Sequence, residues 1–309
     1  MKRWMSFVVF AGIASGWMAF ADYNPYSDNA LADVRLRVID ELGLPIPGVM
    51  VTAAFYIGTS ETTGKEAVTK SDGIVEARYP CNGEFKVWAR KTGCYDTFFK
   101  TKDFITLPFE ESCKKRRWSE GTVEIPVIVK KIRSPTEFRS RMRDHWTIPA
   151  TNITIGLDLE LLDWCAPYGK GTHQDMTVCY EAVEHPEDGW MVSFWRRLTL
   201  AMPNGADGFY QKQIDKFSHF RYDYNANTNA AYSKTLVMET ERRKDQVVKN
   251  ILPRPETYWI FRTRTQTNEL GRIIHANYGR IAEKPGMNFG LTLRTWFNPT
   301  DNDTNLEGN

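Results

Sequence analysis

The stretch VRLRVIDELGLPIPGVMVTAAF, residues 34–55, decides the fold of the first half of the chain. Apolar residues stand at every second position in its two end segments, 34–38 and 49–55. This period of two is typical of half-buried strands. Between them, Pro45 and Pro47 cannot donate to a strand ladder, so this part is expected to be a turn or loop. The stretch therefore predicts a strand, a proline-containing turn and a second strand.

Three motifs in this half of the chain resemble one known family. The pattern V-x-D-x-x-G-x-P-I-P-G-V-x-V over residues 38–51 resembles the opening of carboxypeptidase regulatory-like domains. The turn KSDGI at 70–74 and the segment 84–95, which ends in KTGCY, are similar to later parts of those domains. The resemblance covers about residues 34–132. It implies a small transthyretin-like, Ig-like β-sandwich, a fold that carries no chemistry of its own.

The beginning of the chain has the layout of an export signal. Two basic residues and an apolar run at 5–20 lead to Ala19-Phe20-Ala21, a small-x-small cleavage site, which predicts a signal peptide at 1–21 that is cleaved before Asp22. The run is shorter than the about 20 apolar residues that a spanning helix needs, so a retained anchor is the less favoured alternative. We therefore expect an exported protein, whether periplasmic, cell-surface or secreted. It would have an N-terminal segment at 22–33 and no stable membrane span after cleavage.

Composition limits the classes of function. The formal net charge of +2 falls to zero when the two basic residues of the signal are removed. A mature chain without charge bias has no electrostatic reason to bind nucleic acid. With 42% hydrophobic and 13% aromatic residues the chain is expected to be globular, and its 309 residues suit two domains.

The second half of the chain also predicts strands. The triplet Arg133-Ser134-Pro135 breaks the alternation, so we expect a linker at 133–152. A second all-β domain is expected at 153–299, where alternating segments are separated by turn signals such as Pro203-Asn204-Gly205. A polar, frayed C-terminal tail is expected at 300–309. The predicted fold class is all-β, with an N-terminal transthyretin-like sandwich and a second, larger antiparallel β-sandwich or jelly-roll-like domain.

Several short blocks of this second half resemble a group of exported bacterial proteins of unknown function. In that group the blocks follow a carboxypeptidase regulatory-like domain. The resemblance implies this architecture and nothing about chemistry. Its blocks lie at 158–171, 261–265, 278–281, 298–300 and 305–307.

All five cysteines lie beyond the expected signal peptide. Export to an oxidising compartment makes disulfides possible. Pairing Cys81 with Cys94 is disfavoured, because the predicted strand between them would hold them roughly 20 Å apart. No C-x-x-C motif signals a redox or thiolate zinc site. The better local candidates for disulfides are Cys94–Cys113 and Cys165–Cys179.

Motifs of the common hydrolases and cofactor enzymes are absent from the sequence. None of the five histidines begins an H-x-x-E zinc-peptidase motif, and there is no G-x-S-x-G elbow. There is also no Walker or dinucleotide-binding loop. Residues 301–305 mimic the start of an EF-hand loop, but Leu306 stands where that loop needs glycine. We therefore expect no metal site, no cofactor and no catalytic residue of these classes.

One cluster of acidic and aromatic residues could still form a catalytic or ligand-binding site. Asp158, Glu160 and Asp163 lie close together in the sequence beside Trp164 and Tyr168. On one face of a strand the first two carboxylates would be roughly 7 Å apart, a separation that glycosidases use. A solvated acidic face is the favoured alternative. The two aromatic rings lie in a predicted turn, where they could contact a sugar or peptide, or could instead fold back onto the domain.

The sequence thus favours an exported, non-catalytic binding or scaffolding protein. The alternative is a carbohydrate-active enzyme or carbohydrate-binding protein that uses the cluster described above. The expected partner is a polysaccharide or an envelope protein, and no nucleic acid is expected.

Overall fold

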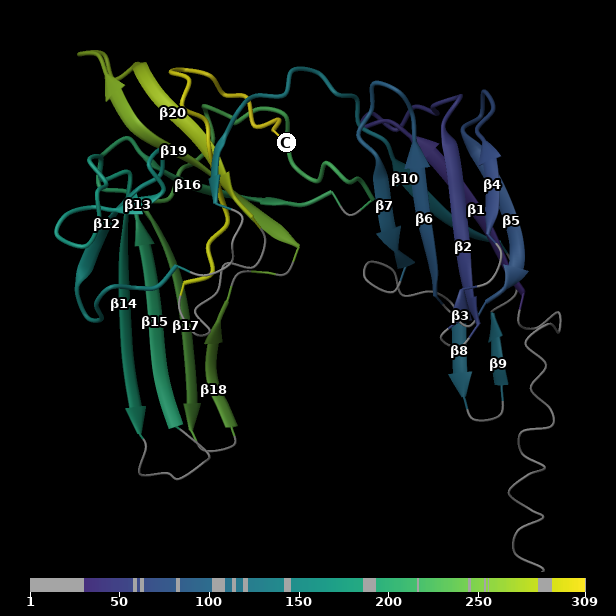
Figure 1. Cartoon of the computed structure of the whole chain (residues 1–309), viewed down its shortest axis with the longest axis horizontal. Coiled ribbons are helices and arrows are strands. Elements are labelled where there is room, and N and C mark those ends of the chain that lie inside the picture. The colour runs from purple at the N-terminus through teal and green to yellow at the C-terminus, as the bar shows by residue number, and fades with distance from the viewer. Residues whose placement is uncertain are drawn as a thin grey trace, which may run out of the picture. The chain divides into compact units, whose positions relative to one another are not determined.

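The structure is a computed structural model in which all regular elements of the described residues are strands (Figure 1). These strands form sheets of three, five, six, five and two strands. The all-β fold class predicted from the sequence is therefore confirmed. The described residues are 31–57, 60–61, 64–81, 84–101, 109–112, 115–118, 122–141, 146–185, 193–215, 217–243, 246–252, 254, 256–282 and 291–308.

The chain divides into two compact units. Unit 1 comprises Met1–Ile132 together with Lys216–Arg221, and unit 2 comprises Arg133–Asp215 and Tyr222–Asn309. The short insert in unit 1 is held by main-chain and ring contacts. The N–H of Ile128 donates to the carbonyl of Phe217 at 3.0 Å, and the Phe220 ring stacks on Tyr95 at 4.8 Å. A segment distant in sequence thereby becomes part of the first unit.

Unit 1 consists of a three-stranded sheet, a five-stranded sheet and a small hairpin. The three-stranded sheet places β1 (Leu31–Ile39) between β5 (Ile74–Pro80), which is antiparallel to it, and β10 (Val123–Ile128), which is parallel. The five-stranded sheet contains β3 (Ser60–Glu61), β2 (Met50–Ile57), β6 (Phe85–Arg90), β7 (Thr97–Lys100) and β4 (Lys65–Val68). The hairpin pairs β8 (Phe109–Ser112) with β9 (Lys115–Trp118).

The alternating residues of 34–55 explain the core of this unit. Successive side chains of a strand point to opposite faces, so each apolar series lies on one face. All members of both series are fully buried, and they pack in one cluster with residues of β5, β6 and β10. These residues are Val34, Leu36, Val38, Val49, Val51, Ala53 and Phe55.

The turns of unit 1 depend on side-chain acceptors and one tightly packed glycine. Asp40 Oδ1 accepts hydrogen bonds from the N–H groups of Leu42 and Leu44, both at 2.9 Å. Gly73 has a φ of +70°, and a Cβ there would lie 2.5 Å from the carbonyl oxygen of Val38. Because an L side chain would be strained and would clash, this turn requires glycine.

Unit 2 contains a six-stranded and a five-stranded sheet. The order β13-β12-β14-β15-β17-β18 forms the first, and β11-β21-β20-β19-β16 forms the second. Strands β19 and β20 are antiparallel neighbours. The bounds are β11 (Arg139–Arg141), β12 (Thr154–Asp158), β13 (Asp163–Trp164), β14 (Met176–His185), β15 (Ser193–Ala201), β16 (Gly208–Gln213), β17 (Thr235–Arg243), β18 (Gln246–Ile251), β19 (Thr257–Thr267), β20 (Ile273–Ile281) and β21 (Thr295–Phe297).

Two hydrophobic clusters cover the five-stranded sheet of unit 2. The larger joins residues of both sheets, among them Leu157, Leu198 and Phe261. The smaller contains Tyr258 and Tyr278 from β19 and β20. The five-stranded sheet is therefore apolar on both faces, which matches the almost continuous burial along β19.

The C-terminal segment and the region expected to be a linker belong to unit 2, and several of their described residues are buried in it. Leu306 and Glu307 are 0% and 1% exposed, and Leu306 lies in the smaller cluster. The guanidinium of Arg280 donates to the carbonyl of Leu306. In the region 133–152, Trp146 is buried in the larger cluster. The prediction of a frayed tail is wrong, because pairing with distant buried groups outweighs the local polarity of the segment.

Candidate functional site

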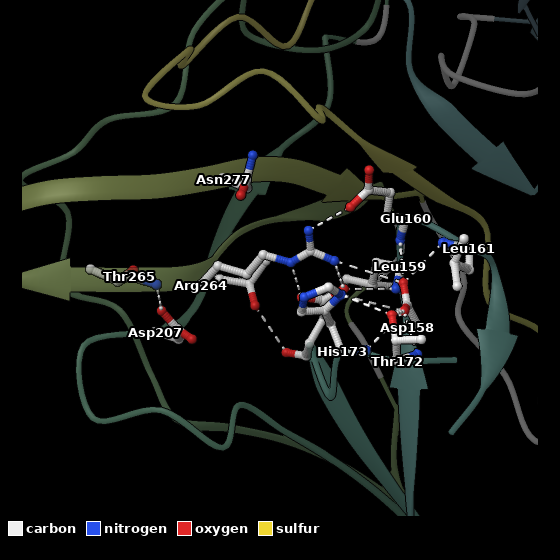
Figure 2. Close-up of polar contacts among 12 residues, drawn as sticks. Asp158, Leu159, Glu160, Leu161, Thr172, His173, Asp207, Arg264, Thr265 and Asn277 are labelled. Carbon is white, nitrogen blue, oxygen red and sulfur yellow. Dashed lines mark hydrogen bonds and ion pairs between the residues drawn. The ribbon is translucent and has the colours of Figure 1, made fainter. Parts of the chain in front are cut away.

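The site is centred on Arg264 of β19, at an irregularity in the strand. The pairing of β19 with β20 shifts register between Thr263 and Gln266. Arg264 has a φ of 55°, in the left-handed region that few residues other than glycine adopt. A bulge of this kind re-aims a side chain, and here it directs the guanidinium toward an acidic cluster (Figure 2).

Arg264 binds two carboxylates directly and approaches a third. Its Nε donates to Oδ1 of Asp175 at 2.7 Å, and its Nη2 donates to Oδ2 at 2.9 Å. Its Nη1 donates to Oε2 of Glu160 at 2.5 Å, and Nη2 lies 3.7 Å from Oδ1 of Asp158. Burial opposes the charge, but the hydrogen bonds to Asp175 and Glu160 outweigh it and raise the pKa of Arg264. The guanidinium is therefore a permanent cation whose charge is neutralised within the cluster.

Asp158 is a structural acceptor. It is 0% exposed. Its Oδ1 accepts the N–H groups of Glu160 and Leu161, and its Oδ2 accepts those of Thr172 and His173, at 2.9–3.0 Å. Burial alone would raise the pKa of this carboxyl, but the four backbone amides together lower it below its ordinary value. A general acid needs a raised pKa, so Asp158 is unsuited to that role.

The other two predicted carboxylates, Asp163 and Glu160, also have hydrogen-bond or ion-pair partners within the protein. Asp163 accepts the N–H of Trp164 at 2.8 Å and that of Lys170 at 2.9 Å, which closes the loop after β13. Glu160 lies in the turn after β12 and is ion-paired with Arg264. Asp158 and Glu160 do not share one face of a strand as expected, because β12 ends at Asp158 and Glu160 lies in the following turn.

The two predicted aromatic residues have different environments. Trp164 is 7% exposed and makes an edge contact with Trp146 at 5.5 Å within the larger cluster. Tyr168 is 41% exposed. Trp164 is thus packed into the domain, whereas the ring of Tyr168 is open to solvent.

The disulfide predicted between Cys165 and Cys179 of unit 2 is not formed in the structure. Cys165 and Cys179 are both free thiols. Cys179 on β14 lies opposite Thr154 of β12. Cys165 instead donates from Sγ to the carbonyl of His173 at 3.4 Å, so the two thiols have different neighbours. Cys94 is free as well, and Cys113, its predicted partner, lies outside the described residues.

A polar pocket of about 540 Å³ opens beside Arg264. Its wall includes His275 and Asn277 of β20, and Asn277 is 3% exposed. The Nδ1 of His275 lies 2.6 Å from Oδ1 of Asp301, in the segment expected to be a frayed tail. The pocket is lined by Glu160, His173, Asn204, Arg264, Thr265, Gln266, His275, Asn277 and Pro299.

Sequence reasoning found Glu160 of this pocket but missed most of the lining. His275, Asn277 and Gln266 lie on a hairpin distant in sequence from Glu160, and no motif marks them. The lining offers amides, imidazoles and a hydroxyl, which suits hydrogen bonding to a polar ligand.

Among the residues that the structure describes, no group of three or more His, Cys, Asp or Glu could hold a metal ion. In the same residues, no helix is long and apolar enough to cross a membrane.

Fold and site together define an all-β protein with a polar pocket in its second unit. No family model matches the chain, and no curated protein matches it. One similar solved structure is a streptococcal ancillary pilin, with 10% identity and a TM-score of 0.24 over 92% of this chain; the chain spans 63% of the pilin's length. Another is a Bacteroides uniformis protein described as a "putative carbohydrate binding protein", with 10% identity and a TM-score of 0.21 over 88% of this chain and 98% of that one. At these TM-scores neither likeness bears on the function of this chain.

Proposed function

We propose that this chain is an exported binding protein whose second unit holds a neutral sugar, as part of a polysaccharide, in the pocket beside Arg264. The single observation that carries the proposal is the lining of that pocket, which is polar apart from Pro299. Export rests on the signal-like segment 1–21, and assignment of unit 1 to the carboxypeptidase regulatory-like domains rests on the motifs at 38–51, 70–74 and 84–95.

The chemistry of the lining favours a ligand rich in hydroxyl groups. Hydroxyls both donate and accept hydrogen bonds, and the exposed Gln266 amide can do the same. The Nδ1 of His275 lies against Asp301, which leaves Nε2 of this ring for a ligand. An anionic ligand is disfavoured, because the one arginine among the described lining residues already binds Asp175 and Glu160. A further negative charge would meet these carboxylates, and the described lining offers no second lysine or arginine to offset it.

The contacts of the predicted carboxylates argue against the carbohydrate-active enzyme as the first choice. A retaining or inverting glycosidase needs one carboxyl with a raised pKa and a second one within reach of the sugar. The pKa of Asp158 is lowered by its backbone donors, and Asp163 closes a loop. A binding role requires neither group to change its protonation.

Isothermal titration calorimetry of the exported form tests the proposal. Neutral oligosaccharides and their uronic-acid counterparts would be titrated into the wild type, into Gln266→Ala and into Gln246→Ala. Gln266 is exposed in the pocket, whereas Gln246 is an exposed glutamine of β18 outside it. We expect saturable binding of a neutral sugar that Gln266→Ala weakens up to about tenfold, the loss of one hydrogen bond.

The control variant should bind as the wild type does. Absence of binding by every neutral sugar, or binding that Gln266→Ala and Gln246→Ala weaken equally, would refute the pocket as the site. Preferential binding of the uronic acids to this pocket would refute the neutral ligand class.

A further inference from the structure

One wall of the unit 2 pocket is a segment that hydrogen bonds fix along β20. The N–H of Asn298 donates to the carbonyl of Tyr278 at 2.9 Å, and the N–H of Asn302 donates to that of Ala276 at 2.9 Å. The side-chain amide of Asn302 donates to the carbonyl of Ile274 at 3.0 Å. These bonds hold the wall in place before a ligand binds, which lowers the entropic cost of binding.

The side chain of Asn298 fixes the backbone around Pro299. Its Oδ1 accepts the N–H of Thr300 at 3.0 Å, and its Nδ2 donates to Oδ2 of Asp303 at 2.9 Å. Asn298 is fully buried, and the next residue, Pro299, lines the pocket. The ring of Pro299 is therefore a rigid apolar surface within a described lining that is otherwise polar or charged.

Asn277 places a hydrogen-bond acceptor next to this apolar surface. It lines the pocket from β20, opposite Thr263 of β19, and Figure 2 shows its amide on the strand next to that of Arg264. Its Nδ2 donates to the carbonyl of Asn298 at 3.2 Å. Since a carbonyl only accepts, this bond sets the orientation of the amide and leaves Oδ1 as the acceptor for a ligand. The carbonyl belongs to the residue before Pro299, so the amide and the proline ring are neighbours.

We propose that the sugar in this pocket is an N-acetylated amino sugar, an inference that rests on the proposed function. An acetamido group carries an N–H donor and a methyl group on the same carbonyl carbon. The N–H donates to Oδ1 of Asn277 while the methyl group packs against the ring of Pro299. A hydroxyl would satisfy the acceptor but would leave the proline uncovered, and the ammonium of a free amino sugar also lacks the apolar group.

Two further lining residues match the rest of such a sugar. Gln266 is exposed and lies opposite His275 in the strand register, and its NH₂ group can donate to the acetamido carbonyl. Asp301 lies 2.6 Å from Nδ1 of His275. A carboxylate accepts, so the proton of the neutral ring is on Nδ1 and Nε2 accepts from a sugar hydroxyl.

Saturation-transfer NMR of the exported form with methyl glycosides tests the inference. Two series would be compared, each with the N-acetylated amino sugar, the parent hexose and the free amino sugar, in the gluco and the galacto configuration. In at least one series we expect the N-acetylated sugar to bind about tenfold tighter than its parent hexose. Its acetyl methyl protons should receive strong saturation from the protein.

Two variants test the assigned contacts through the ratio of the two affinities. Asn277→Ala should abolish the preference for the N-acetylated sugar. Pro299→Ala should reduce the preference about threefold, as for the loss of about one buried methylene contact. Pro47→Ala, at an exposed proline of unit 1 outside the pocket, is the matched control and should keep the wild-type ratio. Pro299 is half-buried, so the inference stays testable even if Asn277→Ala fails to fold.

The outcomes separate this inference from the proposed function. If the hexoses bind as tightly as the N-acetylated sugars, the acetamido assignment is wrong while the neutral-sugar pocket stands. Tighter binding of the free amino sugars, or equal effects of Pro299→Ala and Pro47→Ala, would also overturn it. Absence of binding by every glycoside would overturn it as well, and the calorimetric titration of neutral oligosaccharides would then decide the proposed function separately.

Discussion

Glu307 accepts a hydrogen bond from the backbone N–H of Arg133 at 2.8 Å, which joins the end of unit 2 to its beginning. The second oxygen of the carboxylate accepts the N–H of Ser134 at 2.7 Å. Glu307 is 1% exposed. A buried carboxylate with two amide donors holds together segments that are far apart in the chain.

Glu307→Gln should destabilise the protein by about 1–3 kcal/mol, because an amide NH₂ group would face one of the two N–H donors. Glu269→Gln, at an exposed turn position, serves as the control and should change the free energy of unfolding by less than about 0.5 kcal/mol. Guanidinium denaturation followed by tryptophan fluorescence measures both. Equal effects of the two variants would contradict the role assigned to Glu307.

Asp158→Asn should make stability less dependent on acid pH. The pKa of Asp158 in the folded state lies below its ordinary value, which is about 3.9. The ionised carboxylate therefore contributes stability above that pH, and the contribution is lost as pH falls through the lowered pKa.

At neutral pH the Asp158→Asn variant should be less stable than the wild type by about 2–3 kcal/mol, because one oxygen no longer accepts its two amides. The difference should begin to shrink below about pH 4, the ordinary pKa of the group, and should continue to shrink as pH falls through the lowered pKa of the folded state, where the wild-type carboxyl becomes protonated. Urea denaturation across this pH range provides the measurement. If the difference in free energy of unfolding between wild type and variant does not change with pH, the amides do not stabilise Asp158 through its negative charge.

Arg264→Met should cost about 3–5 kcal/mol, because the buried carboxylate of Asp175 would lose its cation. Arg264→Lys should be intermediate, since an ammonium group keeps the charge but cannot bind Asp175 with two parallel hydrogen bonds. Arg272→Met, at an exposed position beside the β19–β20 turn, is the control. Thermal denaturation would rank the three variants, and a lysine variant as unstable as the methionine variant would argue that guanidinium geometry alone matters.

Cys165 and Cys179 should both react with iodoacetamide when the protein is unfolded without a reducing agent. In the structure they are free thiols with different neighbours. Peptide mass spectrometry would find both residues alkylated. A cross-linked peptide that contains the two cysteines would instead support the disulfide predicted from the sequence.

The strands of the first half could be predicted because their signal is local. The period of two at 34–38 and 49–55 reappears as complete burial of Val34 and Phe55. Trp164 could not be placed in this way. A tryptophan in a turn has the same local sequence whether it faces solvent or packs on Trp146, and the neighbour comes from a region that the sequence assigned to a linker.

The sequence by itself determined the all-β class and the core of the first unit, because alternation along a strand depends only on residues next to one another. Only the tertiary structure decided the candidate site. Arg264 reaches Glu160 and Asp175 across long stretches of chain, and His275 of the pocket wall pairs with Asp301, which lies in the segment that the sequence assigned to a polar tail. Contacts of this kind depend on which strands pair and where a bulge re-aims a side chain, and the burial they produce outweighs the polarity of each segment taken alone.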